Sequence, residues 1–595
     1  MKEPKRLFDF PYFQLENYPQ QRALNTKYDG KWVATSTQEY LDKANAISRA
    51  LIRMGVEPND KVALISTNNR TEWNICDIGI MQTGAQNVPL YPNISEREYE
   101  FILTHSESKF CFVSDKELYE KVMAVKPRIP GLQEVFTFDQ VEGAKNWKEV
   151  LELGKDTAGQ DELDKRKAAI TENDVATLIY TSGTTGQPKG VMLTHKNIAS
   201  NAKNSSERLP IVAGKSSALS FLPVCHVYER MLHYMYQYYG VELHFAESLD
   251  TISENLKEVK PEVMTAVPRL LEKVYDRIYT TGSELTGIKK RLFFWAVDLG
   301  LRYEPYGKNG WWYEFQLGIA NKLIFSKWRE ALGGNLKAVA SGSAPLQPRL
   351  ARVFNAAGIP IMEGYGLTET SPVIAVNDMR NRGFKIGTVG KPIRETEVKI
   401  AEDGEILVRG PQIMLGYFKD EEMTREVIEP DGFLHTGDIG ELDSEGFLTI
   451  TDRKKEMFKT SGGKYIAPAV IENIMKQSRF IEQIMVIGEG EKMPAAFIQP
   501  DFEFVKDWGK LKGYSLPSDL KELVKNQHLI DRIQEEVDHY NQEFGHWETI
   551  KKFELIPEIW SVEGRQLTPT LKMKRRIILE LYPEQYKNIY GHYRE

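Results

Sequence analysis

Tyr180-Thr-Ser-Gly-Thr-Thr-Gly-Gln-Pro-Lys189, with Gly190 behind it, says more about this chain than any other stretch. The apolar run at 174–180 predicts a buried strand that leads straight into it. Glycines free backbone N–H groups to fold around an anion, hydroxyls add donors, and Lys189 adds a positive charge. The segment therefore indicates a site for a nucleotide triphosphate. A Gly/Ser/Thr surface loop is the alternative, and the spacing is not that of the common P-loop, because Lys189 follows proline.

Length and charge limit the fold and the function. A chain of 595 residues exceeds what one hydrophobic core usually supports, so two or more domains are expected. The formal net charge of −7 argues against a general nucleic-acid binder. The N-terminal residues lack the apolar stretch of a signal peptide, and no apolar run approaches the about 18 residues that span a bilayer.

The cysteines point to a compartment. Cys76, Cys111 and Cys225 are scattered and odd in number, without metal-ligand spacing. Structural thiols in a reducing cytoplasm fit this pattern better than a cysteine nucleophile. We expect a cytoplasmic protein, with peripheral contact at the inner face of a membrane left open.

Short apolar runs alternate with helical patterns ahead of the Tyr180 segment. Residues 61–66 and 110–114 predict strands, and residues 38–54 predict a helix. Such alternation is typical of α/β layers with largely parallel sheets. Residues 155–174 are dense in charge and poor in large apolar side chains, which predicts a surface connection.

Residues 286–332 concentrate aromatic side chains beside cations on segments that favour helix, as in Trp311-Trp-Tyr-Glu-Phe315. One interpretation is a helical insertion that packs its aromatics into a core. The other is a wall of a hydrophobic tunnel or a contact with a membrane surface, since basic and aromatic residues together suit an interface. The sequence does not separate them.

After about residue 450 the sequence pattern changes to that of a small, charge-rich α+β module. Ile530, Ile533, Val537, Tyr540 and Phe544 fall at helical spacing, and Gly545 is placed to end that helix. Residues 552–556 alternate as a strand. We therefore expect a large α/β N-terminal domain of layered sheets and helices over 1–452, followed by a small mobile α+β domain over 453–595.

The Tyr180 segment resembles the phosphate-binding loop of the adenylate-forming enzymes, the superfamily of acyl-CoA synthetases, nonribosomal adenylation domains and luciferases. Further segments match that superfamily in the same order, and together they cover most of the chain from Tyr180 to Arg575. The form of two of them looks like fatty acyl-CoA synthetases, with Phe433 where that signature often has Trp and Leu571 where many members have glycine. The matching segments are 221–230, 364–370, 431–440, 446–468 and 567–575.

The resemblance implies ATP, Mg²⁺ and CoA, and it assigns residues to each. Tyr365 lies against adenine, because an aromatic face stacks on a base. Glu369 holds magnesium, because a hard cation prefers carboxylate oxygen. His226 lies beside the phosphates and the entering carboxylate, and it shares the catalytic role with Thr368 and Glu369. The implied N-terminal set is Thr181, Ser182, Gly183, Thr184, Thr185, Gly186 and Lys189 at the phosphates, Gly342, Ser343, Ala344, Gly364, Tyr365 and Gly366 around adenine, Thr368 near the phosphates, and Glu369 with Thr184 at the metal.

The same resemblance assigns the C-terminal residues. Asp438 takes the ribose hydroxyls, since an ionised carboxylate only accepts hydrogen bonds, and Arg453 is the second ribose contact. Lys455 is the hinge between the domains. Lys572 is the catalytic lysine, whose ammonium stabilises charge on the carboxylate and the α-phosphate, with Lys574 as its near alternative. The CoA-binding loop is Ser461, Gly462 and Gly463.

The implied reaction is ATP-dependent activation of a long-chain fatty acid to acyl-AMP, then transfer to CoA. A CoA ligase for an aryl or shorter-chain acid shares every motif, and an enzyme that loads a carrier protein is a second rival, although no carrier domain is seen. A nucleotide-binding regulatory paralogue without turnover would not need Lys189, Glu369 and Lys572 together. A membrane-attached structural protein has only the 286–332 aromatics in its favour. Oligomeric state and preferred chain length stay open.

Overall fold

The computed structural model describes residues 3–182, 187–380, 382–568 and 572–594. The chain forms two compact units, and it passes between them within strands β17 (Glu397–Ile400), β18 (Glu405–Arg409), β20 (Leu434–Leu442) and β21 (Leu448–Arg453), which form a four-stranded sheet in the order β17-β18-β20-β21. The expected α/β body followed by a smaller α+β module is confirmed. Unit 1 comprises Met1–Val398, Leu407–His435 and Asp443–Leu448, and unit 2 comprises Lys399–Ile406, Thr436–Leu442 and Thr449–Glu595.

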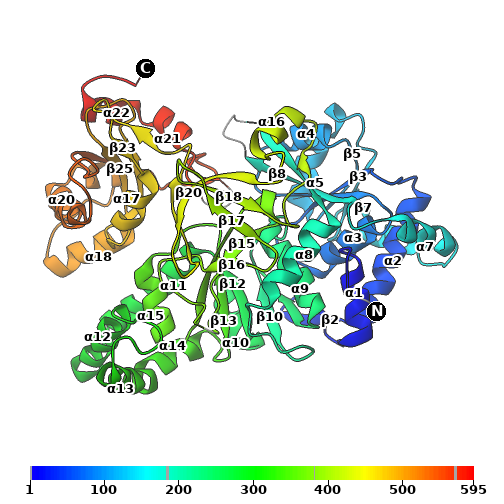
Figure 1. The fold of residues 1–595 in the computed structure, drawn as a ribbon, viewed down its shortest axis with the longest axis horizontal. Helices are drawn as coiled ribbons and strands as arrows, with labels where there is room; N and C mark the ends of the chain where they lie inside the picture. The colour runs from blue at the N-terminus through cyan, green and yellow to red at the C-terminus, as the bar shows by residue number, and fades with distance from the viewer. Residues whose placement is uncertain (1–2, 183–186, 381, 569–571, 595) are drawn as a thin grey trace. The chain divides into compact units, whose positions relative to one another are not determined.

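The first sheet of unit 1 is parallel through its middle and antiparallel at one edge. Its order is β19-β9-β8-β4-β3-β5-β6-β7. Alternate residues of the central strand β3 (Lys61–Ile65) enter different cores, with Val62 and Leu64 in one and Ala63 and Ile65 in the other, so helices cover both faces (Figure 1). Its remaining strands are β4 (Gln86–Leu90), β5 (Ser108–Val113), β6 (Glu134–Thr137), β7 (Lys145–Asn146), β8 (Val175–Ser182), β9 (Pro188–Thr194) and β19 (Gly416–Tyr417).

The second sheet of unit 1 has nine strands in the order β16-β15-β14-β13-β12-β10-β11-β1-β2. The run from β14 to β1 is parallel, which confirms the prediction of largely parallel layers. Its strands are β1 (Leu24–Tyr28), β2 (Lys31–Thr35), β10 (Ser217–Ser220), β11 (Glu242–Phe245), β12 (Val263–Ala266), β13 (Ala338–Ser341), β14 (Ile361–Gly366), β15 (Val373–Val376) and β16 (Lys391–Pro392).

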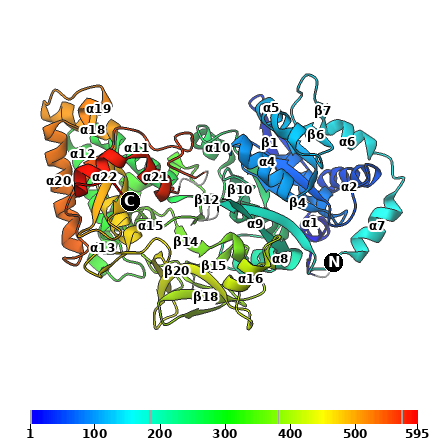
Figure 2. The same ribbon diagram turned by 90° about the horizontal axis from the view of Figure 1, so that it is seen from above.

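Two helices, α8 (His195–Ser206) and α9 (Val227–Tyr238), join the two sheets through one shared core. Ile198 and Met231 pack there with Val191 of the first sheet and Leu243 of the second, and Figure 2 shows both helices from above. The other helices of unit 1 are α1 (Asp9–Asn17), α2 (Thr37–Arg53), α3 (Thr71–Met81), α4 (Glu96–His105), α5 (Lys116–Val125), α6 (Trp147–Leu153), α7 (Gln160–Ala169), α10 (Ile252–Val259), α11 (Pro268–Ser283), α12 (Gly287–Leu301), α13 (Trp311–Ala320), α14 (Ser326–Ala331), α15 (Pro348–Ala356) and α16 (Glu421–Val427).

Local sequence explains most of these elements. The helix predicted over 38–54 is α2, which begins with a capping box in which Ser36 and Glu39 exchange side-chain and backbone hydrogen bonds. The surface connection predicted over 155–174 is confirmed, and it contains the exposed helix α7. That helix buries only Leu163 and carries an Arg166–Glu162 pair one turn apart, so its charge reflects an exposed helix rather than a loop.

Unit 2 packs helices against a three-stranded sheet, in the order β24-β25-β26, beside a two-stranded hairpin. The predicted strand at 552–556 is β26 (Phe553–Leu555). The predicted helix is α20 (Gln527–Tyr540), which ends before Gly545. The remaining elements are β22 (Phe458–Lys459), β23 (Tyr465–Ile466), β24 (Ile481–Ile487), β25 (Ala495–Pro500), α17 (Pro468–Met475), α18 (Phe502–Lys512), α19 (Leu520–Leu523), α21 (Arg575–Leu581) and α22 (Pro583–Tyr590). Across the described residues, no helix of either unit has the length and apolar character needed to cross a membrane.

Candidate active site

The Tyr180 segment forms a β-hairpin. Strand β8 continues two residues beyond the predicted end and pairs antiparallel with β9, so that Thr181 lies opposite Lys189. Gly190 admits the ring of Tyr180, since a Cβ at this position would lie 3.2 Å from a ring carbon. The predicted phosphate contacts Gly183, Thr184, Thr185 and Gly186 lie outside the described residues. Of the predicted set, the hairpin therefore brings Thr181, Ser182 and Lys189 to one end of the first sheet.

Tyr417 links two of the predicted residues that are far apart in the sequence. Its hydroxyl donates a hydrogen bond to Oε1 of Glu369 at 2.9 Å, and the Nζ of Lys189 lies 5.5 Å from the centre of its ring. Burial and the neighbouring Glu369 carboxylate raise the pKa of the Tyr417 hydroxyl, so that it stays a donor. Strand β19 holds Tyr417 beside β9. We did not predict this residue, and no local motif marks it.

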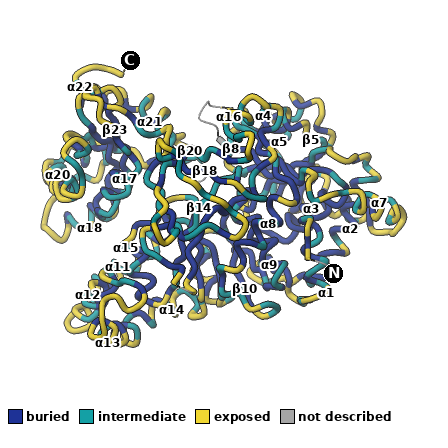
Figure 3. Tube along the Cα trace, viewed as in Figure 1, coloured by how far each residue is buried: buried dark blue, intermediate teal, exposed yellow. Residues whose placement is uncertain are grey.

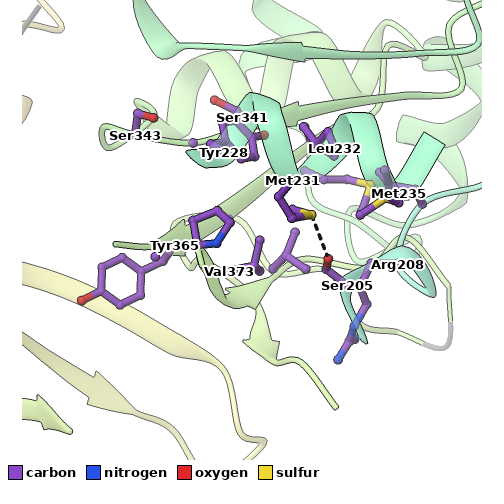
Figure 4. Close-up of a pocket in the computed structure, with 18 of the residues that line it drawn as sticks. Ser205, Arg208, Tyr228, Met231, Leu232, Met235, Ser341, Ser343, Tyr365 and Val373 are labelled. Carbon is purple, nitrogen blue, oxygen red and sulfur yellow. Dashed lines mark hydrogen bonds between the residues drawn. The ribbon is translucent and has the colours of Figure 1, made fainter. Parts of the chain in front are cut away.

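A pocket of unit 1 gathers another group of the predicted residues (Figure 4). His226, Gly342, Ser343, Gly364, Tyr365 and Gly366 all line it. Thr368 and Glu369 lie in the turn directly after β14 and are not part of this lining. Ala344 is exposed and also lies outside the lining, so its assignment to the adenine site stays a prediction.

Gly366 is fixed by close packing of the backbone. A Cβ at this position would lie 1.8 Å from the carbonyl oxygen of Pro372, the residue directly before β15, which pairs with β14. Any side chain at 366 would therefore push β15 away from the pocket. This is the physical reason for the second glycine around Tyr365.

The interior of the pocket is apolar. Figure 4 shows Met231, Leu232 and Met235 of α9 at one end and Tyr365 and Ser343 at the other. The other apolar lining residues are Leu209, Ala340, Met362, Pro372, Val373 and Val376, and the polar residues Ser205, Arg208, Tyr228 and Ser341 complete the lining.

The pocket takes none of its described lining from 286–332. Phe293, Tyr313 and Trp328 of that segment are instead buried in the core beneath the second sheet. The wall interpretation for the segment therefore finds no support in this pocket, while the core interpretation holds for its inner face.

His226 is positioned as a hydrogen-bond donor toward the pocket. It is the N-cap residue of α9, and its Nδ1 accepts a hydrogen bond from the backbone N–H of Tyr228 at 3.2 Å. Because Nδ1 is the acceptor, the neutral ring carries its proton on Nε2. That nitrogen suits an anionic ligand oxygen.

Helix α9 is fixed to the first sheet by a buried charge network that we did not predict. Arg230 donates to Asp77 of α3 at 2.6 Å and to Thr177 of β8 at 2.7 Å. The hydroxyl of Tyr234 also donates to Asp77, at 2.5 Å. Removing one partner of such a buried pair leaves an uncompensated charge, which typically costs about 3–5 kcal/mol. The network therefore holds both the pocket wall and the phosphate-loop strand in one geometry.

Unit 2 places the predicted ribose contacts side by side. Arg453 at the end of β21 and Asp438 on β20 form an ion pair with Nε and Oδ1 3.4 Å apart, and Asp438 is buried. Lys455 lies exposed in the turn after β21, where the N–H groups of Glu456 and Met457 both donate to the carbonyl of Arg453. The position of Lys455 in a turn between β21 and β22 is compatible with a hinge.

The two loops assigned to separate half-reactions occupy different places in unit 2. Ser461, Gly462 and Gly463 form the exposed turn of the β22–β23 hairpin, and the Ser461 N–H donates to the carbonyl of Glu491. The N–H of Lys572 donates to Oγ1 of Thr568 at 3.0 Å. Lys574 occupies the N-cap position of α21.

Comparisons with known proteins agree along nearly the whole chain. The AMP-binding enzyme model matches residues 13–418, and the model of the AMP-binding enzyme C-terminal domain matches 456–594. The chain is 35% identical to the long-chain-fatty-acid–CoA ligase FadD15 of Mycobacterium bovis, covering 95% of this chain and 93% of that protein. It is 32% identical to the peroxisomal long chain acyl-CoA synthetase 7 of Arabidopsis thaliana, covering 97% and 85%. The adenylation domain of a Mycobacterium chelonae carboxylate reductase shares the fold, with a TM-score of 0.73, 22% identity, and coverage of 98% and 91%.

Proposed function

The chain belongs to the AMP-binding enzyme family, and we propose that it is a long-chain fatty acid–CoA ligase. A carboxylate oxygen of the acid attacks the α-phosphorus of ATP, the bond to the β-phosphate breaks, and pyrophosphate leaves as acyl-AMP forms. The deprotonated thiol of CoA then attacks the acyl carbon, and AMP leaves with the electrons of the broken C–O bond. The similarity to FadD15 over 95% of the chain carries this proposal.

Positioned cations and donors overcome the repulsion between two anions in the first step. We propose that Lys189 and the hydroxyls of the β8–β9 turn hold the phosphate tail, while Nε2 of His226 donates to the entering carboxylate. Lys572 would reach the reacting oxygens from unit 2. Asp438 and Arg453 would take the ribose, in keeping with their adjacent side chains. The chemistry then rests on orientation and charge, without a covalent enzyme intermediate.

The magnesium proposal rests on Glu369. The described residues hold no cluster of three or more His, Cys, Asp or Glu side chains arranged for a metal ion. That fits Mg²⁺, which proteins bind through one or two carboxylates together with substrate phosphates. Glu369 offers such a carboxylate, oriented by Tyr417 and close to the hairpin that carries Lys189. When bound there, the ion neutralises phosphate charge.

The apolar pocket interior supports an acyl substrate. Burying one methylene group stabilises by roughly 0.8 kcal/mol, so ten further carbons in an apolar site gain on the order of 8 kcal/mol before ordering costs. The methionines of α9 suit a flexible chain, because an unbranched thioether adapts to irregular shapes. We propose that the acyl chain enters between α9 and β15 while Tyr365 faces the adenine.

We propose that residues 453–595 rotate between the half-reactions about Lys455. Lys572 serves adenylation and Ser461 to Gly463 serve the CoA step, and these segments lie at separate places in the unit. Hinges of this kind concentrate large φ/ψ changes in a few residues while both domains stay rigid.

We also propose a cytoplasmic enzyme with peripheral membrane contact, because its acyl substrates partition into bilayers.

A panel of acids tests the proposed function. Pyrophosphate exchange and acyl-CoA formation should both be measured with hexanoate, laurate, palmitate and benzoate. We expect kcat/KM to be highest for laurate or palmitate in both assays. A maximum for benzoate or hexanoate would contradict the long-chain substrate, and exchange without acyl-CoA formation for any acid would contradict the ligase.

A further inference from the structure

The outer face of α13 is apolar and exposed. Trp311, Trp312 and Phe315 are 78%, 57% and 56% exposed, and Ile319 and Leu323 continue the same stripe at helical spacing. The rings contact one another, with Trp312 stacked on Phe315 at 5.5 Å between ring centres. Figure 3 shows this part of unit 1 largely in the colour of exposed residues. A contiguous aromatic patch of this kind marks an interaction site.

The stripe is additional to the face that holds α13 in the fold. Tyr313, Leu317 and Ala320 are buried on the inner side, and the Tyr313 hydroxyl donates to the carbonyl of Leu299 at 2.7 Å. The outer aromatics are therefore not needed to attach the helix to unit 1. They also contribute nothing to the lining of the described pocket.

The charge around the stripe differs from that of the whole chain. Residues 286–330 carry eight lysines and arginines against four acidic residues, a net charge of +4, within a chain of net charge −7. Lys308, Lys322 and Lys327 are exposed beside the aromatics, whereas Glu314 is the one acidic residue of α13. Exposed tryptophans with flanking lysines are suited to the boundary between lipid headgroups and acyl chains.

We infer that the exposed face of α13, formed by Trp311, Trp312, Phe315 and Ile319 and continued by Leu323 just after the helix, docks with the neighbouring lysines on a membrane that contains anionic lipid. The inference rests on the proposed peripheral contact and names the surface that makes it. The aromatic rings insert at headgroup level, and the lysines lie against lipid phosphates. Attraction by the lysines weakens as salt is added, whereas insertion of the rings does not depend on salt in this way.

Vesicle binding tests the inference. The probe is a vesicle of equal parts phosphatidylcholine and phosphatidylglycerol, with vesicles of phosphatidylcholine alone as comparison. We expect the wild type to co-sediment with the anionic vesicles. The triple variant Trp311→Ser, Trp312→Ser, Phe315→Ser should bind these vesicles with an affinity lower by at least roughly tenfold. Lys308→Glu with Lys322→Glu should lose the preference for anionic vesicles.

Matched control variants distinguish binding by this surface from non-specific hydrophobic binding and from misfolding. Leu249→Ser and Leu511→Ser remove other exposed apolar side chains, at 69% and 88% exposure, and should leave binding unchanged. The triple variant should keep the thermal unfolding midpoint and its acyl-CoA synthesis from laurate in solution. If the wild type also fails to synthesise acyl-CoA, that result contradicts the proposed function and leaves the inferred membrane-binding surface unaffected.

Two outcomes overturn the inference. The first is equal vesicle binding by the triple variant and the wild type. The second is a wild type that is dimeric in light scattering without lipid while the triple variant is monomeric, which would assign the face to a second copy of the chain.

Discussion

Arg575 holds both carboxylate oxygens of Glu472, with its Nη2 at 2.5 and 2.6 Å from them. Its Nε donates to Glu456, one residue after Lys455, and its Nη1 donates to the carbonyl of Val486. Arg575 is the last residue of the 567–575 segment that carries Lys572. One guanidinium therefore joins the segment of the proposed catalytic lysine to α17, to β24 and to the turn of the proposed hinge.

Arg575→Lys should displace the Lys572 segment, because an ammonium cannot replace the planar fork that serves three acceptors. We expect pyrophosphate exchange to fall at least about tenfold and unit 2 to lose about 3 kcal/mol, as when a buried pair is broken. Thioester formation from supplied acyl-AMP should fall much less. The matched control is Arg576→Lys, whose exposed pair with Glu580 contributes about 0.5 kcal/mol or less. Equal effects of both substitutions would refute a positioning role.

Tyr417→Phe should weaken the use of magnesium and ATP while leaving the fold intact. The change removes only the hydroxyl that donates to Glu369. A hydrogen bond to a charged group contributes about 1.5 kcal/mol, so we expect kcat/KM for Mg·ATP to fall roughly tenfold, with a higher Mg²⁺ requirement. Tyr593→Phe, at an exposed tyrosine, is the control. Unchanged magnesium titrations in both variants would remove Tyr417 from the site.

Lys572→Ala should abolish most adenylation, since its positive charge is needed while two anions approach. Thioester formation from supplied acyl-AMP should be much less affected, because that step does not face the same repulsion. Lys574→Ala is the comparison, because Lys574 occupies the N-cap position of α21 and lies two residues away. If Lys574→Ala shows the larger adenylation defect, the roles of the two lysines must be exchanged.

Lys455→Pro should trap one orientation of the C-terminal domain. Proline fixes φ near −65° and restricts the preceding residue, here Lys454. We expect pyrophosphate exchange to survive and acyl-CoA synthesis to be lost. Lys455→Ala removes the charge but keeps the torsional freedom, so it should retain both activities. Identical behaviour of the two variants in both assays would make Lys455 an ordinary surface lysine.

Asp452 should make the stability of unit 2 depend on pH. Burial, together with the nearby Glu472 carboxylate, raises the pKa of its carboxyl to about 7, against the lowering by the hydrogen bond from the Arg453 N–H. Oδ2 of Asp452 has no hydrogen-bond partner among the described residues. An unfolded aspartate ionises near pH 3.9, so between about pH 4 and pH 7 the folded state binds more protons and loses stability as pH rises. The loss reaches at most about 4 kcal/mol.

Asp452→Asn should abolish this slope, because the amide keeps an acceptor for Arg453 and cannot ionise. Urea midpoints at about pH 5 and about pH 8 measure it, with exposed Asp507→Asn as the control. We expect the Asn variant to be the more stable protein at the higher pH and the control to follow the wild type. A wild type that gains stability over this range through unit 2 would contradict the raised pKa.

Local sequence was sufficient for several elements, including the strand that leads into the Lys189 segment, but not for the hairpin that this strand forms with β9. The strand before Thr181, the helix from Thr37 and the strand at Phe553 follow from apolar periodicity and capping residues, which act over a few neighbouring positions. The motif around Tyr365 could also be identified from the sequence. Its Gly366 lies so close to a neighbouring backbone carbonyl that only glycine fits there. Composition at 160–169 indicated a surface segment but not its helix, because a charged helix and a charged loop look alike.

By itself, the sequence of this protein determined its two-part α/β and α+β architecture and six of the residues that line the pocket. Tertiary packing decided what joins them: Tyr417 meets Glu369 because β19 pairs with a distant strand, and Arg230 meets Asp77 because α9 packs on α3. Packing alone also chose which apolar stripe of 311–323 is buried and which is left exposed. The physical reason is that periodicity encodes an element and its faces, whereas the partner of each face depends on contacts between segments far apart in the chain.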